Sequence, residues 1–353
     1  MKNNALKSVL AVILGLMAGA LLMAAMGHNP VQGYSFLLKG SLSSTERIAN
    51  TIATATPLIL TGLSVGFAFR TGLFNIGAPG QMLFGGFAAT AVALTCTSLP
   101  RPVLLLAIIL AGFIAGALCA GIVGFLKAKF NVHEVVGSIM LNWTAYWVVY
   151  YLIPQYFKSD GAETESRQIS SLASLKAEWI TKAFDGSFIN YGIVIAILAV
   201  IVIWFILDKT TLGYQLKAVG FNKDAAEYAG INVNKNVVLT MMIAGSLAGL
   251  AGVAQYIGNA TCMQIGVMPS QGFDGIAVAL LGNSSPIGVL ISALFFGLLY
   301  AGKGFMTTMT SVPPEIADTI MAIIIYFAAT SMIFDKVLVK FKRKKNLKAK
   351  EEK

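Results

Sequence analysis

The chain has 353 residues, of which 56% are hydrophobic and 12% are charged, and its formal net charge is +10. Soluble domains carry roughly 25% charged residues, so this composition excludes an ordinary soluble protein. Several apolar runs reach the ~20 residues that a helix needs to cross a bilayer, and they lack the alternation of a membrane β-barrel. The predicted fold class is therefore an all-α polytopic membrane protein.

In chain order, the apolar runs predict ten segments, of which the eighth is too short to cross the membrane alone. They lie near residues 8–26, 50–69, 80–98, 103–126, 134–153, 188–207, 237–257, 272–283, 286–302 and 314–334. The first run exceeds the usual length of a signal-peptide core, so we expect it to be retained as a span. We expect about 8–10 transmembrane helices in a single transmembrane domain over residues 1–353.

The orientation follows from the distribution of basic residues. If the chain alternates sides from a cytoplasmic N-terminus, most lysines and arginines lie inside, as the positive-inside rule requires. Both termini then lie in the cytoplasm, and the basic tail 335–353 meets the anionic headgroups of membrane lipids. The tail lacks the aromatic interleaving and the fold signatures of nucleic-acid binders, so we expect no nucleic-acid partner.

Two segments interrupt the apolar pattern with glycine, proline, asparagine and glutamine: RTGLFNIGAPGQ at residues 70–81 and GNATCMQIGVMPSQGFDG at residues 258–275. Irregular backbone at membrane depth survives only when it is buried in protein or lines a wet cavity, and broken helices in transporters mark the substrate path. The two segments share a gapped pattern of Ile-Gly, Pro-x-Gln, Phe and Gly, which indicates a possible internal repeat. We therefore expect broken or re-entrant helices here.

These segments and the fifth apolar run, near residues 134–153, supply the candidate residues of a substrate path. Amide side chains offer paired donors and acceptors suited to a neutral, hydroxyl-rich or heterocyclic solute, and an aromatic face can stack on a planar ring. The candidates are Asn75, Gln81, Asn142, Trp143, Gln271, Phe273 and Asp274. Each has a purely structural alternative: the amides can satisfy broken backbone, Trp143 can pack or belong to an aromatic belt, and Asp274 can cap a short helix at Gly275–Leu281.

The loop 154–188 is expected on the outside. Within it, SLASLKAEWITKAF carries apolar residues near the spacing of one helical face, which predicts an amphipathic helix on the outer membrane surface. They are Leu172, Leu175, Trp179, Ile180 and Phe184. Such a helix either offers a platform to an extracellular partner or caps the bundle.

No pattern in the sequence carries enzymatic chemistry. The chain has no phosphate-binding loop and no run of intramembrane acids, and its three cysteines lack metal-ligand spacing. We therefore expect a protein that is not an enzyme and has no metal site, cofactor or disulfide framework. If it transports a solute against a gradient, the energy must come from a partner.

A polar segment, Thr211–Ile231, lies between two long apolar runs inside the expected cytoplasmic loop 208–236. This segment and the following NVNKNVVLTMMIAGSLAGLAG resemble the cytoplasmic coupling region of ABC-transporter permeases for branched-chain amino acids, ribose and nucleosides. RTGLFNIGAPGQ and GFDGIAVALLGNSSPIG are similar to permeases of nucleoside uptake systems in particular. The resemblance covers residues from about Ile52 to Phe334.

The resemblance implies an importer permease for nucleosides in the cell membrane. It would pair with a second related permease, ABC ATPase subunits and an extracellular substrate-binding lipoprotein. The residues that would couple to the ATPase are Gly220, Asn222, Asp224, Ala225, Ala226, Glu227, Tyr228 and Gly230. Asn222 is expected to cap a short helix there and Gly230 to end it. The alternatives are a permease of this type for a simple sugar or amino acid, and a carrier or channel that works without an ATPase.

Overall fold

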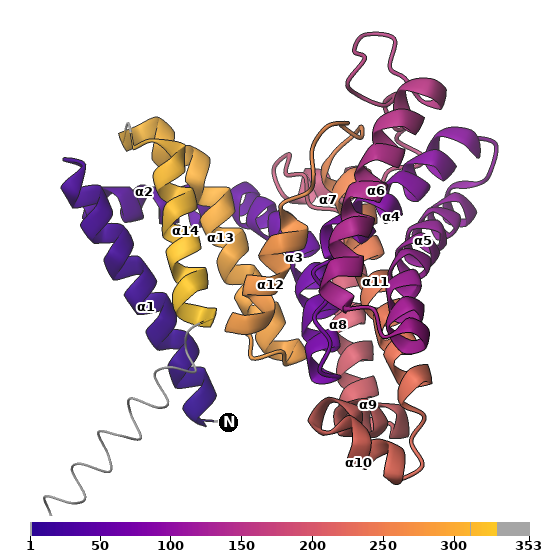
Figure 1. Cartoon of the computed structure of the whole chain (residues 1–353). Coiled ribbons are helices and arrows are strands. Elements are labelled where there is room, and N and C mark those ends of the chain that lie inside the picture. Colours follow the sequence, from indigo (N-terminus) through magenta and orange to yellow (C-terminus); the bar gives the residue numbers. More distant parts are fainter. Residues whose placement is uncertain (1, 311, 330–353) are drawn as a thin grey trace, which may run out of the picture. The chain divides into compact units, whose positions relative to one another are not determined.

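The computed structural model describes residues 2–310 and 312–329, and this part of the chain consists of helices, loops and two isolated β-bridges (Figure 1). The helices are α1 Lys2–Ala25, α2 Pro30–Leu42, α3 Thr45–Arg70, α4 Ala78–Thr95, α5 Arg101–Phe130, α6 Glu134–Tyr156, α7 Glu178–Ala183, α8 Gly192–Lys209, α9 Thr211–Phe221, α10 Lys223–Tyr228, α11 Val233–Val253, the π-helix η1 Ala254–Asn259, α12 Gln271–Leu281, α13 Pro286–Thr310 and α14 Pro314–Ala329. The predicted all-α polytopic class is confirmed.

Seven helical segments of the described chain are long and apolar enough to cross a membrane: those of α1, α3, α5, α6, α8, α13 and α11 together with η1. The predicted spans near 80–98, 272–283 and 314–334 correspond to α4, α12 and α14. The helix α12 has only 11 residues, as its short apolar run predicts. The basic tail 335–353 lies outside the described residues.

The described residues form two compact units, one of residues 38–302 and one of residues 2–37 with 303–310 and 312–329. In the smaller unit, α1 packs against α14 and the Tyr34 hydroxyl donates to the carbonyl of Leu16 at 2.6 Å. Lys303 on α13 binds both carboxylate oxygens of Asp318 on α14 at 2.6 Å, which neutralises two charges on adjacent apolar helices.

In the larger unit, α3 and α11 are the central helices, with 83% and 78% of their apolar windows buried. The helices α11 and α5 cross at four glycines, where a β-carbon on Gly249 would overlap the carbonyl oxygen of Gly112 and one on Gly116 would overlap that of Gly245. Without side chains, the two backbones touch directly. Close packing of this kind replaces the hydrophobic effect between helices in lipid.

The two broken segments are arranged reciprocally. The helix α3 ends at Arg70, residues 71–77 fold back along it, and α4 then packs on α11. In the same way, α11 ends in η1, a loop follows, and α12 then packs on α3. The directions are opposite, because the end of η1 reaches the start of α3 through the bond from Asn259 Nδ2 to the Ala53 carbonyl. An inverted repeat produces this reciprocal packing, so the repeat stays a prediction with which the geometry agrees.

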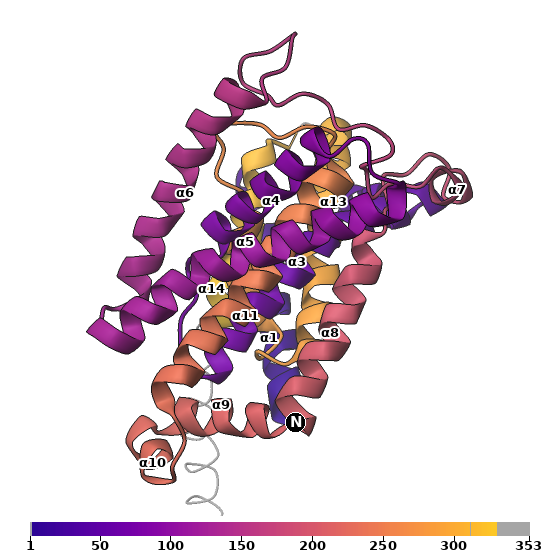
Figure 2. The ribbon, with the colours of Figure 1, turned by 90° about the vertical axis from the view of Figure 1, so that its right-hand side faces the viewer.

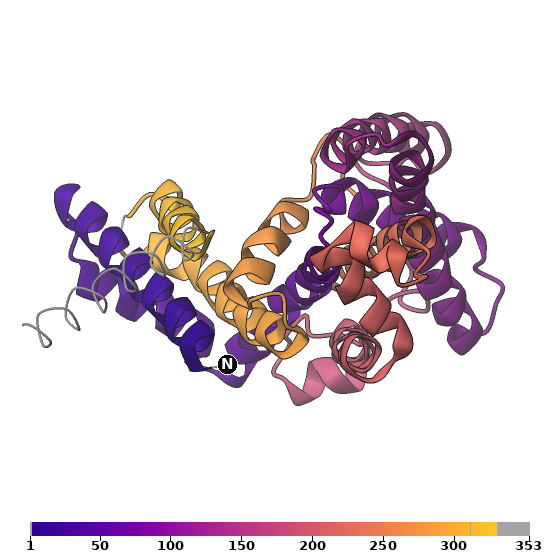
Figure 3. The same cartoon turned by 60° about the horizontal axis from the view of Figure 1, so that its bottom comes forward.

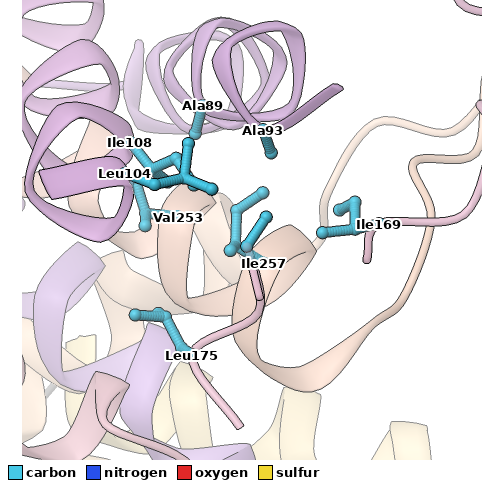
Figure 4. Close-up of a cluster of buried hydrophobic side chains, with 9 residues drawn as sticks. Ala89, Ala93, Leu104, Ile108, Ile169, Leu175, Val253 and Ile257 are labelled. Atoms are coloured by element: carbon cyan, nitrogen blue, oxygen red, sulfur yellow. The ribbon is translucent and has the colours of Figure 1, made fainter. Parts of the chain in front are cut away.

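The loop 154–188 differs from the expectation of an amphipathic helix over residues 171–184, because the predicted helix is wrong in its extent. Only α7 is helical, while the residues before it form turns that run along η1. The amide of Leu175 donates to the Ile257 carbonyl and its own carbonyl accepts from Tyr191, so these groups are not available for a helical ladder. Leu175 and Ile169 enter a buried cluster with Val253 and Ile257 (Figure 4). The loop is therefore part of the core of this end of the larger unit.

The helix α2 was not predicted. Its local signal is the pair Asn29-Pro30: the Asn29 side chain accepts from the amide of Val31 at 3.0 Å, and Pro30 occupies the first helical position. Asparagine at the N-cap followed by proline is a typical start of a helix.

Candidate functional site

The first broken segment is held together by a reciprocal pair of amides. Asn75 Nδ2 donates to Gln81 Oε1 and Gln81 Nε2 donates to Asn75 Oδ1, both at 2.9 Å. Asn75 also donates to the Ser64 hydroxyl of α3 at 3.0 Å and accepts from the amide of Gly77. Both side chains are buried. In this conformation their hydrogen-bonding groups are therefore directed to protein.

Asn142 on α6 also forms hydrogen bonds to the first broken segment. Its Oδ1 accepts from the amide of Gly80 and its Nδ2 donates to the carbonyl of Ile76, both at 3.0 Å. These backbone groups lie at the start of α4, where the helix leaves its first amides without helical partners. The side chain of Asn142 is buried, whereas its neighbour Trp143 is largely exposed.

This bridging makes Asn142 a strong test of the local structure. In Asn142→Leu, the amide of Gly80 and the carbonyl of Ile76 lose their partner in a buried place, at about 1–3 kcal/mol each. We expect a lower melting temperature and less folded protein by size-exclusion chromatography. Thr144→Val is the control, because the Thr144 hydroxyl bonds only the Met140 carbonyl of its own helix. Equal melting temperatures for the two variants would contradict this role.

The second broken segment meets the first. A β-carbon on Gly272 would overlap Pro79, and the carbonyl of Gln271 accepts from the Thr61 hydroxyl of α3 at 2.9 Å. The starts of α4 and α12 thus converge on the middle of α3. Asp274 lies in the first turn of α12 instead of at its N-cap, because the helix begins at Gln271. The expected capping position for Asp274 is therefore wrong, although an acid in the first turn still suits the helix dipole.

Gln271 borders a hollow of about 240 Å³ in front of this segment. Its lining residues are Gln255, Tyr256, Gln264, Val267, Met268, Pro269, Ser270 and Gln271. Three glutamine side chains and one tyrosine give it several donors and acceptors around a partly apolar wall. Phe273, in the same first turn of α12, is 46% exposed.

A continuous aromatic face runs along α6. Trp143, Trp147 and Tyr151 are all more than half exposed, and they border a shallow groove of about 580 Å³ with Met140, Thr144, Val148 and Leu152. Tyr146 joins the face through edge contacts with Trp143 at 5.5 Å and Trp147 at 5.2 Å between ring centroids. The sequence indicated Trp143 alone; the period of four between positions 143, 147 and 151 could have indicated the rest.

The loop 154–188 is hydrogen-bonded to the second broken segment. The amide of Ser166 donates to the Met263 carbonyl, the Ser166 hydroxyl accepts from the Met263 amide, and the Ile265 amide donates to the Thr164 carbonyl, all at 2.9 Å. Glu165 also accepts from Gln264 of the hollow at 3.1 Å. Any movement of residues 263–265 must therefore move residues 164–166 as well or break these bonds.

The reactivity of the Cys262 thiol is a measure of the contact between Glu165 and the second broken segment. Burial raises the pKa of this thiol, and the nearby Glu165 carboxylate raises it further. Since the thiolate is the reactive form, alkylation of Cys262 with a maleimide at pH 7 should be slow. In a background with serine at the other two cysteines, Glu165→Gln should increase the alkylation rate several-fold. The difference should vanish at a pH above both pKa values, where the thiol is fully ionised. Equal rates at pH 7 would contradict the contact.

At the opposite end of the larger unit, α9 and α10 project beyond the ends of α8 and α11 (Figure 2). Asn222 caps α10, its side chain accepting from the amide of Ala225 at 3.0 Å. Gly230 takes φ +80° and the amide of Ile231 donates back to the Ala226 carbonyl, which closes the helix. The predicted start and stop of this helix are confirmed.

Two expected coupling residues have a different role from the others. Gly220 lies within α9, where a β-carbon would lie 2.5 Å from the carbonyl oxygen of Arg70, so it permits close contact with the end of α3. Ala226 is buried between α9 and α10. The remaining ones, Asn222, Asp224, Ala225, Glu227, Tyr228 and Gly230, are exposed.

The most exposed apolar side chains of this end were not all identified from the sequence. Tyr228 is 99% exposed, Phe221 91% and Tyr214 72%. Tyr214 and Phe221 line the groove between α9 and α10, and Tyr228 is the last residue of α10. We call Tyr214, Phe221 and Tyr228 the aromatic tip. Exposed aromatic side chains on a polar surface indicate a protein interface, and their place in the polar segment Thr211–Ile231 was the available signal.

Membrane-spanning helices that break at two converging points are typical of polytopic transport proteins. The chain belongs to the family described as branched-chain amino acid transport system / permease component, which matches residues 47–329. It is therefore a transport subunit of the cell membrane and not an enzyme.

Several curated proteins are similar to it over nearly their whole length. The guanosine ABC transporter permease protein NupP of Bacillus subtilis is 40% identical, with 97% of this chain and 98% of that protein covered. The nucleoside ABC transporter permease protein NupB of Lactococcus lactis is also 40% identical, covering 96% of each. The glucose ABC transporter permease protein TsgB13 of Haloferax volcanii is 33% identical, covering 94% and 88%.

A second permease from each of the first two organisms matches more weakly. NupQ of Bacillus subtilis, also described as a guanosine ABC transporter permease, is 30% identical over 70% of this chain and 78% of its own length. NupC of Lactococcus lactis, described for nucleosides, is 29% identical over 71% and 80%.

Proposed function

We propose that this chain is the permease subunit of an ABC importer that carries nucleosides across the cytoplasmic membrane by alternating access. The observation that carries the proposal is 40% identity, over nearly the full length, to two permeases described for guanosine and for nucleosides. Hydrolysis of ATP belongs to separate ATPase subunits, and an extracellular substrate-binding lipoprotein delivers the solute. The N-terminus and the α9–α10 end are assigned to the cytoplasm, which the distribution of basic residues favours.

The second permease of the importer is proposed to be a relative of NupQ and NupC. Two organisms each have a pair of permeases described for the same solute, and this chain is 40% identical to one member of each pair and 29–30% identical to the other. That pattern supports a heterodimer of two related permeases rather than two copies of this chain.

The aromatic face of α6 is proposed to line the substrate path, with the second permease covering it from the other side. Its rings can stack on a nucleobase, and stacking accepts purines and pyrimidines alike because every base has a π-face. The hollow at Gln255, Gln264 and Gln271 lies near the outer loop and supplies hydrogen bonds for ribose hydroxyls. Phe273 and Asp274 extend this path along α12.

The buried amides have a different part in the proposal. Asn75, Gln81 and Asn142 hold the start of α4 in this conformation. A rearrangement between two bundle states exchanges such bonds as a set, since each buried donor needs a partner in both states. They therefore serve the path by fixing the broken helix.

Coupling is assigned to the aromatic tip and to the exposed residues of α10, including Asp224 and Glu227. Closure of the ATPase subunits on ATP then favours one bundle state over the other. The contact of Gly220 with the end of α3 connects α9 to the start of the first broken segment. The bond from Arg70 Nε to the Ser284 carbonyl at 2.9 Å links the same end of α3 to the turn that follows α12.

The experiment is uptake of labelled guanosine, uridine, glucose and leucine into cells with the gene present or deleted. Loss of guanosine and uridine uptake alone is the expected result. Loss of glucose uptake instead would favour the sugar alternative, which the 33% identity to TsgB13 supports. Uptake that survives depletion of ATP on a downhill gradient would favour a carrier that works without an ATPase.

A further inference from the structure

A groove of about 570 Å³ lies between the last turns of α5 and the first turns of α11, on the same end of the larger unit as α9 and α10. Figure 3 views the helices from nearer this end. The lining residues are Phe125, Ala128, Lys129, Asn232, Asn234, Lys235, Val238, Leu239 and Met242. The groove is thus polar at its mouth and apolar along the spans.

Two lysines at the mouth lack a carboxylate within 4.0 Å among the residues that the structure describes: Lys129 and Lys235. The contrast with Lys127 is direct, since that side chain binds Glu134 at 2.6 Å only two positions from Lys129. Lys129 instead lies 5.6 Å from the ring centroid of Phe125 and 5.7 Å from that of Phe130. Within the described ranges 2–310 and 312–329, the mouth therefore carries two positive charges with no carboxylate within 4.0 Å.

The apolar part of the groove has a closed floor. An ideal β-carbon on Gly124 would lie 3.0 Å from Val238 Cα and from Met241 Cβ, so α5 and α11 touch beneath it. Phe125, Leu239 and Met242 form the walls and are partly exposed. This wall belongs to two helices that are long and apolar enough to cross a membrane, and its partly exposed apolar side chains suit contact with hydrocarbon.

We propose that this groove binds one anionic phospholipid of the cytoplasmic leaflet. The phosphate contacts Lys129 and Lys235, and an acyl chain follows the apolar wall toward Met242. Basic pockets between spanning helices at the cytoplasmic surface bind acidic headgroups in this way. The inference rests on the proposed orientation of the chain and not on the identity of the transported solute.

The chemistry of the groove favours a lipid over the other possible occupants. A soluble phosphate would leave the apolar wall without a partner, and a zwitterionic lipid would bring a cation next to the two lysines. The ATPase is expected at the aromatic tip, which lies on α9 and α10 and not on the α5 side of α11. A molecule with a negative head and an apolar chain satisfies both parts of the groove.

The test is native mass spectrometry of the complete transporter in detergent, titrated with phosphatidylglycerol, phosphatidylcholine or inorganic phosphate. We expect one phosphatidylglycerol to be retained more tightly than the others. In Lys129→Gln/Lys235→Gln its affinity should fall about 25-fold, at about fivefold per lysine. Lys129→Arg/Lys235→Arg should retain it, and Met242→Trp should weaken it with both lysines present, because the indole fills the chain path.

Lys209→Gln/Lys217→Gln is the matched control, since it removes two positive charges from the same end outside the groove. The proposal is overturned if both double glutamine variants lose lipid equally, or if phosphatidylcholine binds as tightly as phosphatidylglycerol. Binding of phosphate alone with the same lysine dependence would also overturn it. A groove variant that loses its ATPase subunits while keeping its lipid would assign the groove to the ATPase.

Discussion

Gly249→Ala is expected to destabilise the larger unit strongly, although it adds only one methyl group. The new β-carbon would overlap the carbonyl oxygen of Gly112 and would lie 3.1 Å from the Cα of Gly116. Neither neighbour is the end of a flexible side chain, so α11 and α5 must move apart as rigid helices. That movement also loosens α4, which packs on both.

The size of this effect follows from overpacking, which costs about 1–3 kcal/mol and more when backbone must shift. We expect a large loss of folded protein in membranes and a melting temperature lower by many degrees in detergent. Gly304→Ala is the matched control: nothing lies within 4 Å of its β-carbon position on α13. Alanine there should be neutral or slightly stabilising, because it favours the helix. Similar losses in both variants would show that the crossing of α5 and α11 is not the cause.

Removing the aromatic tip is expected to abolish ATP-driven uptake while leaving the membrane domain folded. Phe221 and Tyr228 are 91% and 99% exposed, so Phe221→Ala/Tyr228→Ala removes almost no internal packing. If these rings are anchors for the ATPase, each should contribute about 2 kcal/mol or more to association. We expect co-purification of the ATPase to fall at least 100-fold and uptake to disappear.

The control for this variant is Tyr156→Ala, which removes a 64% exposed ring at the C-terminal end of α6. It should leave association with the ATPase unchanged. Ala226→Arg is a poorer test, because Ala226 is buried between α9 and α10 and arginine there would break the helix pair itself. Normal co-purification and uptake in the double alanine variant would remove the coupling role of the aromatic tip.

Local signals in the sequence were sufficient for the class of fold and for several details. Runs of apolar residues predicted the spans, because the length of a crossing helix is set by the bilayer alone. The cap at Asn222 and the stop at Gly230 were predicted because both act within one turn of the helix. The positions of the two broken segments followed from residues that lipid does not tolerate.

Contacts between distant residues required the tertiary structure. The sequence left open whether Asn75, Gln81 and Asn142 bind a solute or satisfy broken backbone. Only the fold brings Asn75 and Gln81 together and directs Asn142 to the amide of Gly80. Likewise, the apolar spacing near Leu175 predicted a helix, but the Leu175 amide donates to the Ile257 carbonyl of η1 instead of to a carbonyl of its own segment.

One physical reason separates the features that the sequence predicted from those that required the tertiary structure. The bilayer and the first turn of a helix act on each segment separately, so the sequence by itself determined an all-α membrane protein with two broken helices and a capped α10. The pairing of a buried amide, the contact of Gly249 with Gly112 and the exposure of Phe221 and Tyr228 depend on which helix lies alongside. Only the tertiary structure decided those.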